Sequence, residues 1–234
     1  MKNIQLTIVF SLISLSFFAQ ISNSEKQALQ DLYTSTNGDS WNTSWDLNQP
    51  ATDWQGVTIK DDKVISISLL FNNLEGTIPS SIGQLTHLEN LELSFNKLEG
   101  NIPSEIGNLK NLKVLAFNGN NLTGTIPSSI GNLSSLNQLH LSSNQLTGKI
   151  PQSITNLEYL EILNVFDNDL SGEIPSELAH SKNLKQLMVA ENNLFTSTEF
   201  STELLSHGAS VDLEQQFIIP NTKEVIAIES EEEN

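Results

Sequence analysis

The side chains that could perform catalysis or bind a metal are few and widely spaced. The chain of 234 residues contains no cysteine, which excludes a thiol nucleophile, a thiolate-metal site and a disulfide scaffold. His140 has no second histidine and no carboxylate pair at metal-ligand spacing, so we interpret it as an ordinary exposed histidine. The other histidines, His87, His180 and His207, lie in expected turns and a terminal cap. We therefore expect no catalytic residues, no metal site and no cofactor.

The triplet Asp167-Asn168-Asp169 is similar to a fragment of a calcium-binding loop, because its oxygen-bearing side chains are ones that Ca²⁺ prefers. The glycine and the distal glutamate of such a loop do not follow at the required spacing. Asn168 also belongs to a series of asparagines that recurs through the chain, so a structural role is the better interpretation.

That series defines the organisation of the chain. The stretch Ile67–Pro79 (ISLLFNNLEGTIP) recurs at Leu91, Leu115, Leu139 and Leu163, and a partial copy begins at Leu187. A fixed period in this range is typical of a solenoid, an elongated domain built from stacked coils. Leucines alternate with polar residues, which predicts a short strand per coil, and strands one period apart must pair in parallel. The asparagines recur at one constant interval without a slip, and we expect their amides to form a hydrogen-bonded ladder between coils: Asn72, Asn96, Asn120, Asn144, Asn168 and Asn192.

The repeat L-x-x-L-x-L-x-x-N-x-L-x-G-x-I-P, which runs from Val64 to about Leu194, resembles the plant-type leucine-rich repeat. That class includes polygalacturonase-inhibiting proteins and the ectodomains of receptor-like kinases. The resemblance implies an α/β solenoid, a right-handed structure with a parallel sheet on its concave face, about six coils and a cap at each end. Trp54-Gln55-Gly56-Val57-Thr58 is similar to the strand that leads from the plant N-terminal cap into the first repeat. The two cysteines that flank that strand in the plant proteins are absent, which suggests a cysteine-free, bacterial form.

The chain divides into five segments. Lys2 and the apolar run after it predict a secretory signal peptide that is removed near Ala19-Gln20. The predicted segments are the signal peptide (1–19), an N-terminal cap with a helix and a Trp-rich loop (20–63), the repeats (64–194), a C-terminal cap (195–229) and an acidic tail (230–234).

Both caps have recognisable helix patterns. In the first, Ser24–Tyr33 predicts a helix capped by Ser24. Trp41, Trp45 and Trp54 could stack on carbohydrate, but we favour packing over the first coil, because a solenoid must cover its ends.

In the C-terminal cap, Glu199–His207 predicts a helix that covers the last coil with Phe200, Leu204 and Leu205. Val211–Ile219 and Val225–Ile228 are strand-like but leave the repeat pattern, so they complete the cap or pair as a hairpin.

Positions that differ between coils are the candidates for ligand binding, because positions that barely vary serve packing. Phe166, His140, Asn164 and Glu92 form our expected contact surface on the strand face. For Phe71 and Phe95, packing of each ring against the next coil is the favoured alternative. The full candidate set is Phe71, Glu92, Phe95, His140, Asn164, Phe166 and Met188.

The formal net charge of −17 argues against nucleic acid and anionic membranes as partners. After the signal peptide, no segment is apolar enough to span a membrane. We expect a secreted or extracytoplasmic, monomeric, non-enzymatic module that binds a protein, peptide or polysaccharide through its concave face. One alternative is a structural or adhesive spacer at the cell surface. A weaker one is ice binding, because Thr123 and Thr125 form a Thr-x-Thr pair in an array that charged residues interrupt.

Overall fold

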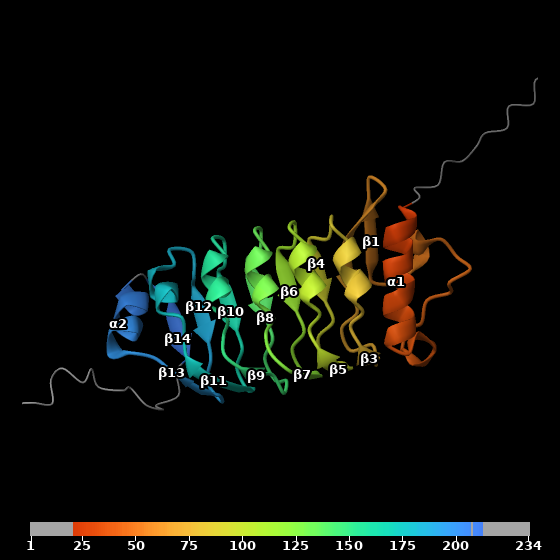
Figure 1. The fold of residues 1–234 in the computed structure, drawn as a ribbon. Helices are drawn as coiled ribbons and strands as arrows, with labels where there is room; N and C mark the ends of the chain where they lie inside the picture. The colour runs from red at the N-terminus through yellow and green to blue at the C-terminus, as the bar shows by residue number, and fades with distance from the viewer. Residues whose placement is uncertain (1–20, 207, 213–234) are drawn as a thin grey trace, which may run out of the picture.

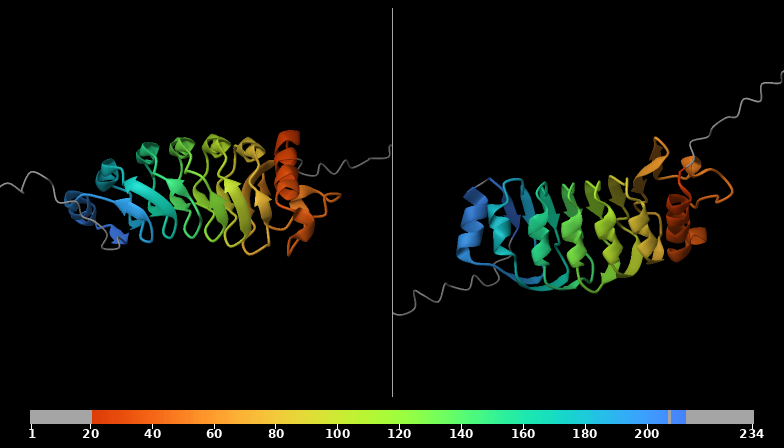
Figure 2. Two further views of the ribbon diagram at one scale, coloured as in Figure 1. Left: turned by 60° about the horizontal axis from the view of Figure 1, so that its bottom comes forward. Right: turned by 45° about the horizontal axis from the view of Figure 1, so that its top comes forward.

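The computed structural model describes residues 21–206 and 208–212. They form an elongated α/β solenoid with long rows of strands on one side and short helices on the other (Figure 1). Figure 2 shows the short helices following one another along the solenoid, with a longer helix at each end. The predicted signal peptide, the acidic tail and residues 213–229 of the predicted C-terminal cap lie outside the described residues.

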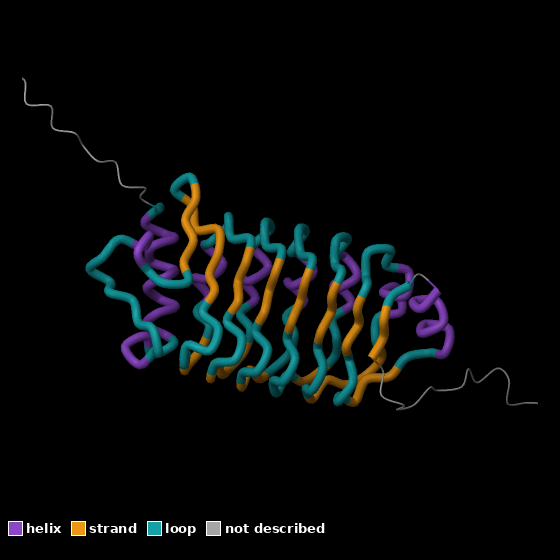
Figure 3. Tube along the Cα trace, turned by 180° about the vertical axis from the view of Figure 1, so that it is seen from behind, coloured by secondary structure: helices purple, strands orange, loops and turns teal. Residues whose placement is uncertain are grey.

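The principal sheet, seen from behind in Figure 3, has eight strands in the part of the chain that the structure describes. The first pair is an antiparallel hairpin, and every later pair is parallel with partners one full repeat apart, as in Leu91 and Leu115. The expected parallel sheet is thus confirmed. In spatial order the strands are β1 (Val57–Lys60), β2 (Lys63–Ser68), β4 (Asn90–Glu92), β6 (Val114–Ala116), β8 (Gln138–His140), β10 (Ile162–Asn164), β12 (Gln186–Met188) and β14 (Ser210–Asp212).

Strand β14 lies where the sequence predicts that the repeat has ended. Leu187 of β12 pairs with Val211 of β14, so the register of the principal sheet continues for one more strand. The prediction that Val211 leaves the repeat pattern is therefore wrong. The sequence does contain a signal for this strand, since the apolar Val211 follows Leu187 by one full period. Strand register depends on which face is buried, so one apolar residue at the right spacing continues the sheet even where the rest of the repeat motif is missing. Val225–Ile228 lies outside the described residues.

After its asparagine, each coil contributes a strand to one of two smaller sheets. These are β3 (Glu75–Thr77), β5 (Lys97–Asn101) and β7 (Asn121–Thr123), then β9 (Thr147–Gly148), β11 (Asp169–Glu173) and β13 (Asn193–Phe195). An isolated bridge between Thr125 and Thr147 links the two sheets. Cross-strand partners here are slightly closer in sequence than one full repeat, as in Thr77 with Glu99 rather than with Asn101. A shift of two positions leaves every side chain on its own face, so the inward leucines stay inside.

The side opposite the principal sheet consists of 3₁₀ helices, each of which begins directly after a repeat proline. Pro103 has φ −67° and directly precedes the second of them, because the proline ring holds φ near the value that a helical turn requires. A Cβ atom at Gly107 would lie 2.5 Å from the carbonyl oxygen of Ser129, so the close stacking of coils requires glycine there. The 3₁₀ helices are η3 (Ser80–Gln84), η4 (Ser104–Asn108), η5 (Ser128–Asn132), η6 (Gln152–Asn156) and η7 (Ser176–His180).

The side chains of the repeat asparagines lie inside the turns that follow the principal strands. Asn120 Nδ2 donates to the carbonyls of Leu93 and Phe117 at 3.1 and 2.9 Å. Its Oδ1 accepts the backbone N–H of Leu98 at 3.0 Å. Asn96, Asn144, Asn168 and Asn192 make equivalent bonds. Asn72, in the first coil, instead bonds to the backbone of Thr43 in the cap.

Helix α1 (Asn23–Ser35) covers the N-terminal end of the solenoid, followed by two single-turn helices, η1 (Gly38–Ser40) and η2 (Ala51–Asp53). Its N-cap is Ser22, so the prediction of Ser24 is wrong. Ser22 Oγ accepts the N–H of Glu25, and the carboxylate of Glu25 accepts the N–H of Ser22. In a capping box the acidic partner lies three residues after the N-cap, so Glu25 identifies Ser22 rather than Ser24 as the N-cap of the helix.

The three tryptophans of the cap are buried, which confirms that they pack over the first coil. Trp45 and Trp54 stack with ring centroids 4.9 Å apart. Each indole N–H donates to a backbone carbonyl, as Trp41 does to Thr36 at 2.8 Å. Their ring faces are thus occupied by protein and are not a carbohydrate platform.

Helix α2 (Thr198–Ser206) covers the opposite end. Phe200 and Leu204 are buried as predicted, whereas Leu205 exposes 56% of its surface. The expectation that Leu205 covers the last coil is wrong. Residues four apart share one face of a helix, and the next residue is turned about 100° away from it.

Candidate functional site

The outward side chains of the principal sheet form a continuous surface. Glu92, Ala116, His140, Asn164 and Met188 occupy one column, because β4, β6, β8, β10 and β12 pair in register. The four candidates among them are half-buried, and the small Ala116 separates Glu92 from His140. The strand pairing therefore brings four predicted site residues together on one face.

His140 is half-buried, so the prediction of an ordinary exposed histidine is wrong. Burial lowers its pKa below the ordinary value of 6.5, although the charge of Glu92 acts in the opposite direction. Its Nε2 lies 3.1 Å from Gln138 Oε1, an acceptor for an N–H on that nitrogen. At neutral pH His140 is thus an uncharged hydrogen-bonding side chain rather than a cation.

Asn164 and Phe166 lie next to His140 on β10 and the turn after it. Asn164 Nδ2 donates to Ser142 Oγ at 3.3 Å, and its Oδ1 accepts the N–H of Phe166 at 3.1 Å. Phe166 is half-buried. These bonds hold the amide of Asn164 and the backbone of Phe166, an arrangement suited to contact with a partner rather than to proton transfer.

Phe71 and Phe95 form a separate aromatic feature near the N-terminal end. Their rings are parallel to within 3°, with centroids 4.5 Å apart. Each ring lies against the next coil, as the packing alternative predicts, yet Phe71 exposes 64% and Phe95 47% of its surface. Leu70, which the sequence analysis did not select, is also exposed beside them. Its signal was its place directly before Phe71, in the same repeat column as Phe166.

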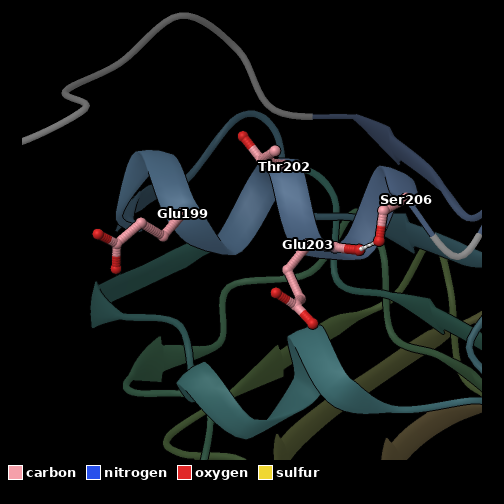
Figure 4. Close-up of a pocket in the computed structure, with 4 residues that line it drawn as sticks. All are labelled: Glu199, Thr202, Glu203 and Ser206. Carbon is pink, nitrogen blue, oxygen red and sulfur yellow. Dashed lines mark hydrogen bonds between the residues drawn. The ribbon is translucent and has the colours of Figure 1, made fainter.

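A shallow hollow lies on the outer face of α2 (Figure 4). It is lined by Glu199, Thr202, Glu203 and Ser206, all of which are exposed. Ser206 Oγ donates to the carbonyl of Glu203 at 2.6 Å, and the Glu203 carboxylate lies 3.9 Å from His180 Nε2. The hollow contains none of the predicted site residues and does not enclose its carboxylates.

Residues 21–206 and 208–212 were also compared with the requirements for a metal site and for a membrane-spanning helix. No group of three or more histidine, aspartate or glutamate residues in these ranges is placed to hold a metal ion. None of their helices combines the length and the apolar character that crossing a bilayer requires.

The threonines considered for ice binding do not form a regular array. Thr77 pairs with Glu99 and Asn101 with Thr123, because the register of the smaller sheets is shorter than one full repeat. Thr125 faces Thr147 through an isolated bridge. Charged and amide side chains interrupt the surface, as the sequence predicted.

Comparison with known proteins places the fold among receptor ectodomains. A family model described as a leucine-rich repeat region matches residues 63–207. A probable leucine-rich repeat receptor-like protein kinase of Arabidopsis thaliana is 36% identical over 92 residues, which make up 36% of this chain and 10% of the kinase. The chain therefore spans only a small part of that relative.

Two solved structures from Arabidopsis thaliana extend the comparison. A chain of the BIR3–SERK2 complex is 36% identical, with a TM-score of 0.60, over 72% of this chain and 93% of that one. The ectodomain of the receptor kinase GASSHO1/SCHENGEN3, in complex with CASPARIAN STRIP INTEGRITY FACTOR 2, is 29% identical, with a TM-score of 0.72. That match covers 81% of this chain and 23% of the ectodomain.

Proposed function

The chain belongs to the leucine-rich repeat family, and we propose that it is an extracytoplasmic, non-enzymatic module that binds a protein or peptide through the outward face of its principal sheet. The observation that carries the proposal is the surface formed by His140, Asn164, Phe166 and Met188. Its side chains differ from coil to coil and are held by strand pairing and local hydrogen bonds. The predicted signal peptide (1–19) supplies the export that this role requires.

The physical basis is preorganisation. Parallel strands fix the backbone of His140, Asn164 and Met188, and hydrogen bonds hold the backbone of Phe166 in the turn after β10, so binding requires little further ordering of the protein. The surface combines an aromatic ring, a thioether, an uncharged imidazole and an amide, which suits mixed apolar and polar contacts. The similar BIR3–SERK2 complex, and the GASSHO1/SCHENGEN3 ectodomain in complex with CASPARIAN STRIP INTEGRITY FACTOR 2, support a binding role for a module of this fold.

The test is capture of ligand from the extracellular fraction of the organism that makes the protein, with a glycan array in parallel. We expect the triple variant His140→Ala, Asn164→Ala, Phe166→Ala to lose capture while its melting temperature stays within about 4 °C of the wild type. A matched control removes a histidine, an asparagine and an aromatic residue outside the sheet face: His87→Ala, Asn132→Ala, Tyr159→Ala, all at exposed positions.

The outcomes separate the competing functions. Loss of capture in the triple variant but not in the control supports recognition through the sheet face. Equal capture by both variants contradicts it and favours a spacer whose attachment depends on its termini. Selective binding on the glycan array that the triple variant abolishes would keep the site and replace the protein or peptide with a polysaccharide.

A further inference from the structure

The residues directly before the repeat asparagines form a continuous line along the solenoid, which we name the corner row: Phe71, Phe95, Gly119, Ser143, Asp167 and Glu191. The backbone N–H of each of the first five donates to a carbonyl of the next coil, at distances between 2.7 and 3.2 Å. Consecutive corners are thus tied together in the same register as the principal sheet. The row runs parallel to the sheet face, at the end of its strands.

The backbone of the corner row disfavours side chains. All six residues have positive φ, between 52° for Phe71 and 63° for Gly119. This left-handed conformation costs about 1–2 kcal/mol for a residue with a Cβ atom, with aspartate among the more tolerant types. Phe71 and Glu191 are exposed, and stacking buries only part of the Phe95 surface, so burial offsets little of that cost. Glycine at position 119 demonstrates that the turn does not need a side chain. Strained residues of this kind cluster at ligand contacts.

One end of the corner row is apolar and flat. The Phe71 ring stacks on the Phe95 ring, and the Phe95 ring in turn lies over Gly119. A Cβ atom at position 119 would come within 2.7 Å of Phe95 Cδ1, so the glycine makes room for the ring. With the exposed Leu70 beside it, this end is an apolar patch on a protein with a large negative net charge.

The other end of the corner row is acidic. Asp167 and Glu191 occupy neighbouring corners, and both side chains are exposed. Asp169, two residues beyond Asp167, is exposed as well, whereas the corresponding residue after Phe95 is Lys97. Among the corner-row residues and the positions two residues beyond them, one end is therefore apolar with a single lysine, and the carboxylates lie at the other end.

We propose that the corner row binds an extended, basic peptide segment, with an aromatic or aliphatic residue on the Phe71–Phe95 stack and lysine or arginine against Asp167 and Glu191. This inference rests on the proposed binding function and names its ligand class. Opposite charge favours such a partner, because the chain carries a net charge of −17. Arginine can also pair with a carboxylate through two parallel hydrogen bonds.

The spacing of the row sets the spacing in the ligand. Phe95 and Asp167 are three coils apart, which corresponds to about 14 Å at a strand separation of about 4.8 Å. An extended chain advances about 3.3 Å per residue, so the apolar and basic residues of the ligand should be separated by about four positions.

The test uses the full chain, fluorescently labelled, on an array of synthetic peptides. Each peptide carries one tryptophan and one arginine pair in a serine and glycine background, with every separation from adjacent to about seven residues, in both orders. We expect binding to peak near a separation of about four, at least about tenfold above the peptide with adjacent groups. Peptides with glutamate in place of arginine should not bind.

Variants of the protein test which end of the corner row binds tryptophan and which binds arginine. Phe71→Ser with Phe95→Ser should abolish the preference for tryptophan, and Asp167→Asn with Glu191→Gln should abolish the preference for arginine. The matched control, Glu99→Gln with Glu173→Gln, removes the same charge from exposed positions in the smaller sheets and should leave the array pattern unchanged. Melting temperatures verify that each variant is folded.

The failures of the two proposals are distinguishable. The absence of peptide binding, binding that ignores separation, or binding that survives both row variants would overturn the corner-row proposal. If capture still depends on His140, Asn164 and Phe166 in that case, the sheet-face function stands alone. Glycan binding that requires Phe71 and Phe95 would likewise overturn the basic peptide as the occupant of the row.

Discussion

The side chain of Glu25 accepts a hydrogen bond of 3.2 Å from the backbone N–H of Val64, 39 residues further along the chain. The same carboxylate completes the capping box with Ser22, so a single residue joins the first helix to the first coil. Glu25 is only 3% exposed. Burial acts to raise its pKa, but hydrogen bonds from Ser22 and Val64 and the charge of Lys63 outweigh it, so the pKa falls below its ordinary value of 4.5.

We predict that Glu25→Gln destabilises the protein by about 1–3 kcal/mol at pH 7, because charged hydrogen bonds to buried donors are lost. A carboxyl with a lowered folded pKa contributes stability above its unfolded pKa and loses it as the pH falls through the folded value. The difference between wild type and variant should therefore shrink below about pH 4.5 in urea unfolding curves. A difference that grows with acidity would contradict this account, and Glu75→Gln, at an exposed position, is the control.

We predict that Asn120→Ala lowers the free energy of unfolding by about 1–3 kcal/mol, because it leaves the carbonyl of Phe117 and the N–H of Leu98 without their side-chain partner. The neighbouring Asn121→Ala changes an exposed residue and should stay within about 0.5 kcal/mol of the wild type. Chemical denaturation of both variants measures the difference. Equal stabilities would show that water replaces the amide without cost.

We predict that Glu92→Gln lowers the pKa of His140 further, because the Glu92 charge is the factor that opposes the effect of burial. The measurement is the NMR titration of the His140 ring protons in wild type and variant. Glu99→Gln, at an exposed position in a smaller sheet, should leave that titration unchanged. A rise in the pKa of His140 on removal of Glu92 would mean that the two side chains do not interact as described.

We predict that Leu204→Ala destabilises the C-terminal cap by about 2–5 kcal/mol, whereas the adjacent Leu205→Ala changes stability by less than about 0.5 kcal/mol. Leu204 is fully buried and Leu205 is exposed. Hydrogen exchange should show the Leu204→Ala effect first in β12 and β14, the strands nearest the cap, since each coil contacts only its neighbours. Similar effects of the two substitutions would mean that Leu204 is not on the buried face of α2.

The candidate site was only partly predictable. The alternation of leucines identified Glu92, His140, Asn164 and Met188 as outward residues, and strand pairing places them in one column. The half-buried state of His140 and Phe166 was not predictable, because burial depends on contacts with neighbouring coils. The acidic end of the corner row was not selected as a site, although the repeat places Asp167 and Glu191 in the same column as Phe71 and Phe95.

The sequence by itself determined the solenoid, its parallel sheet and its inward leucines, because a strict period repeats the same local geometry in every coil. The tertiary structure alone decided three other matters. It set a shorter register in the smaller sheets, extended the principal sheet to Val211, and left the stacked rings of Phe71 and Phe95 exposed. A period specifies what recurs along the chain, whereas exposure and register depend on which side chains meet between coils.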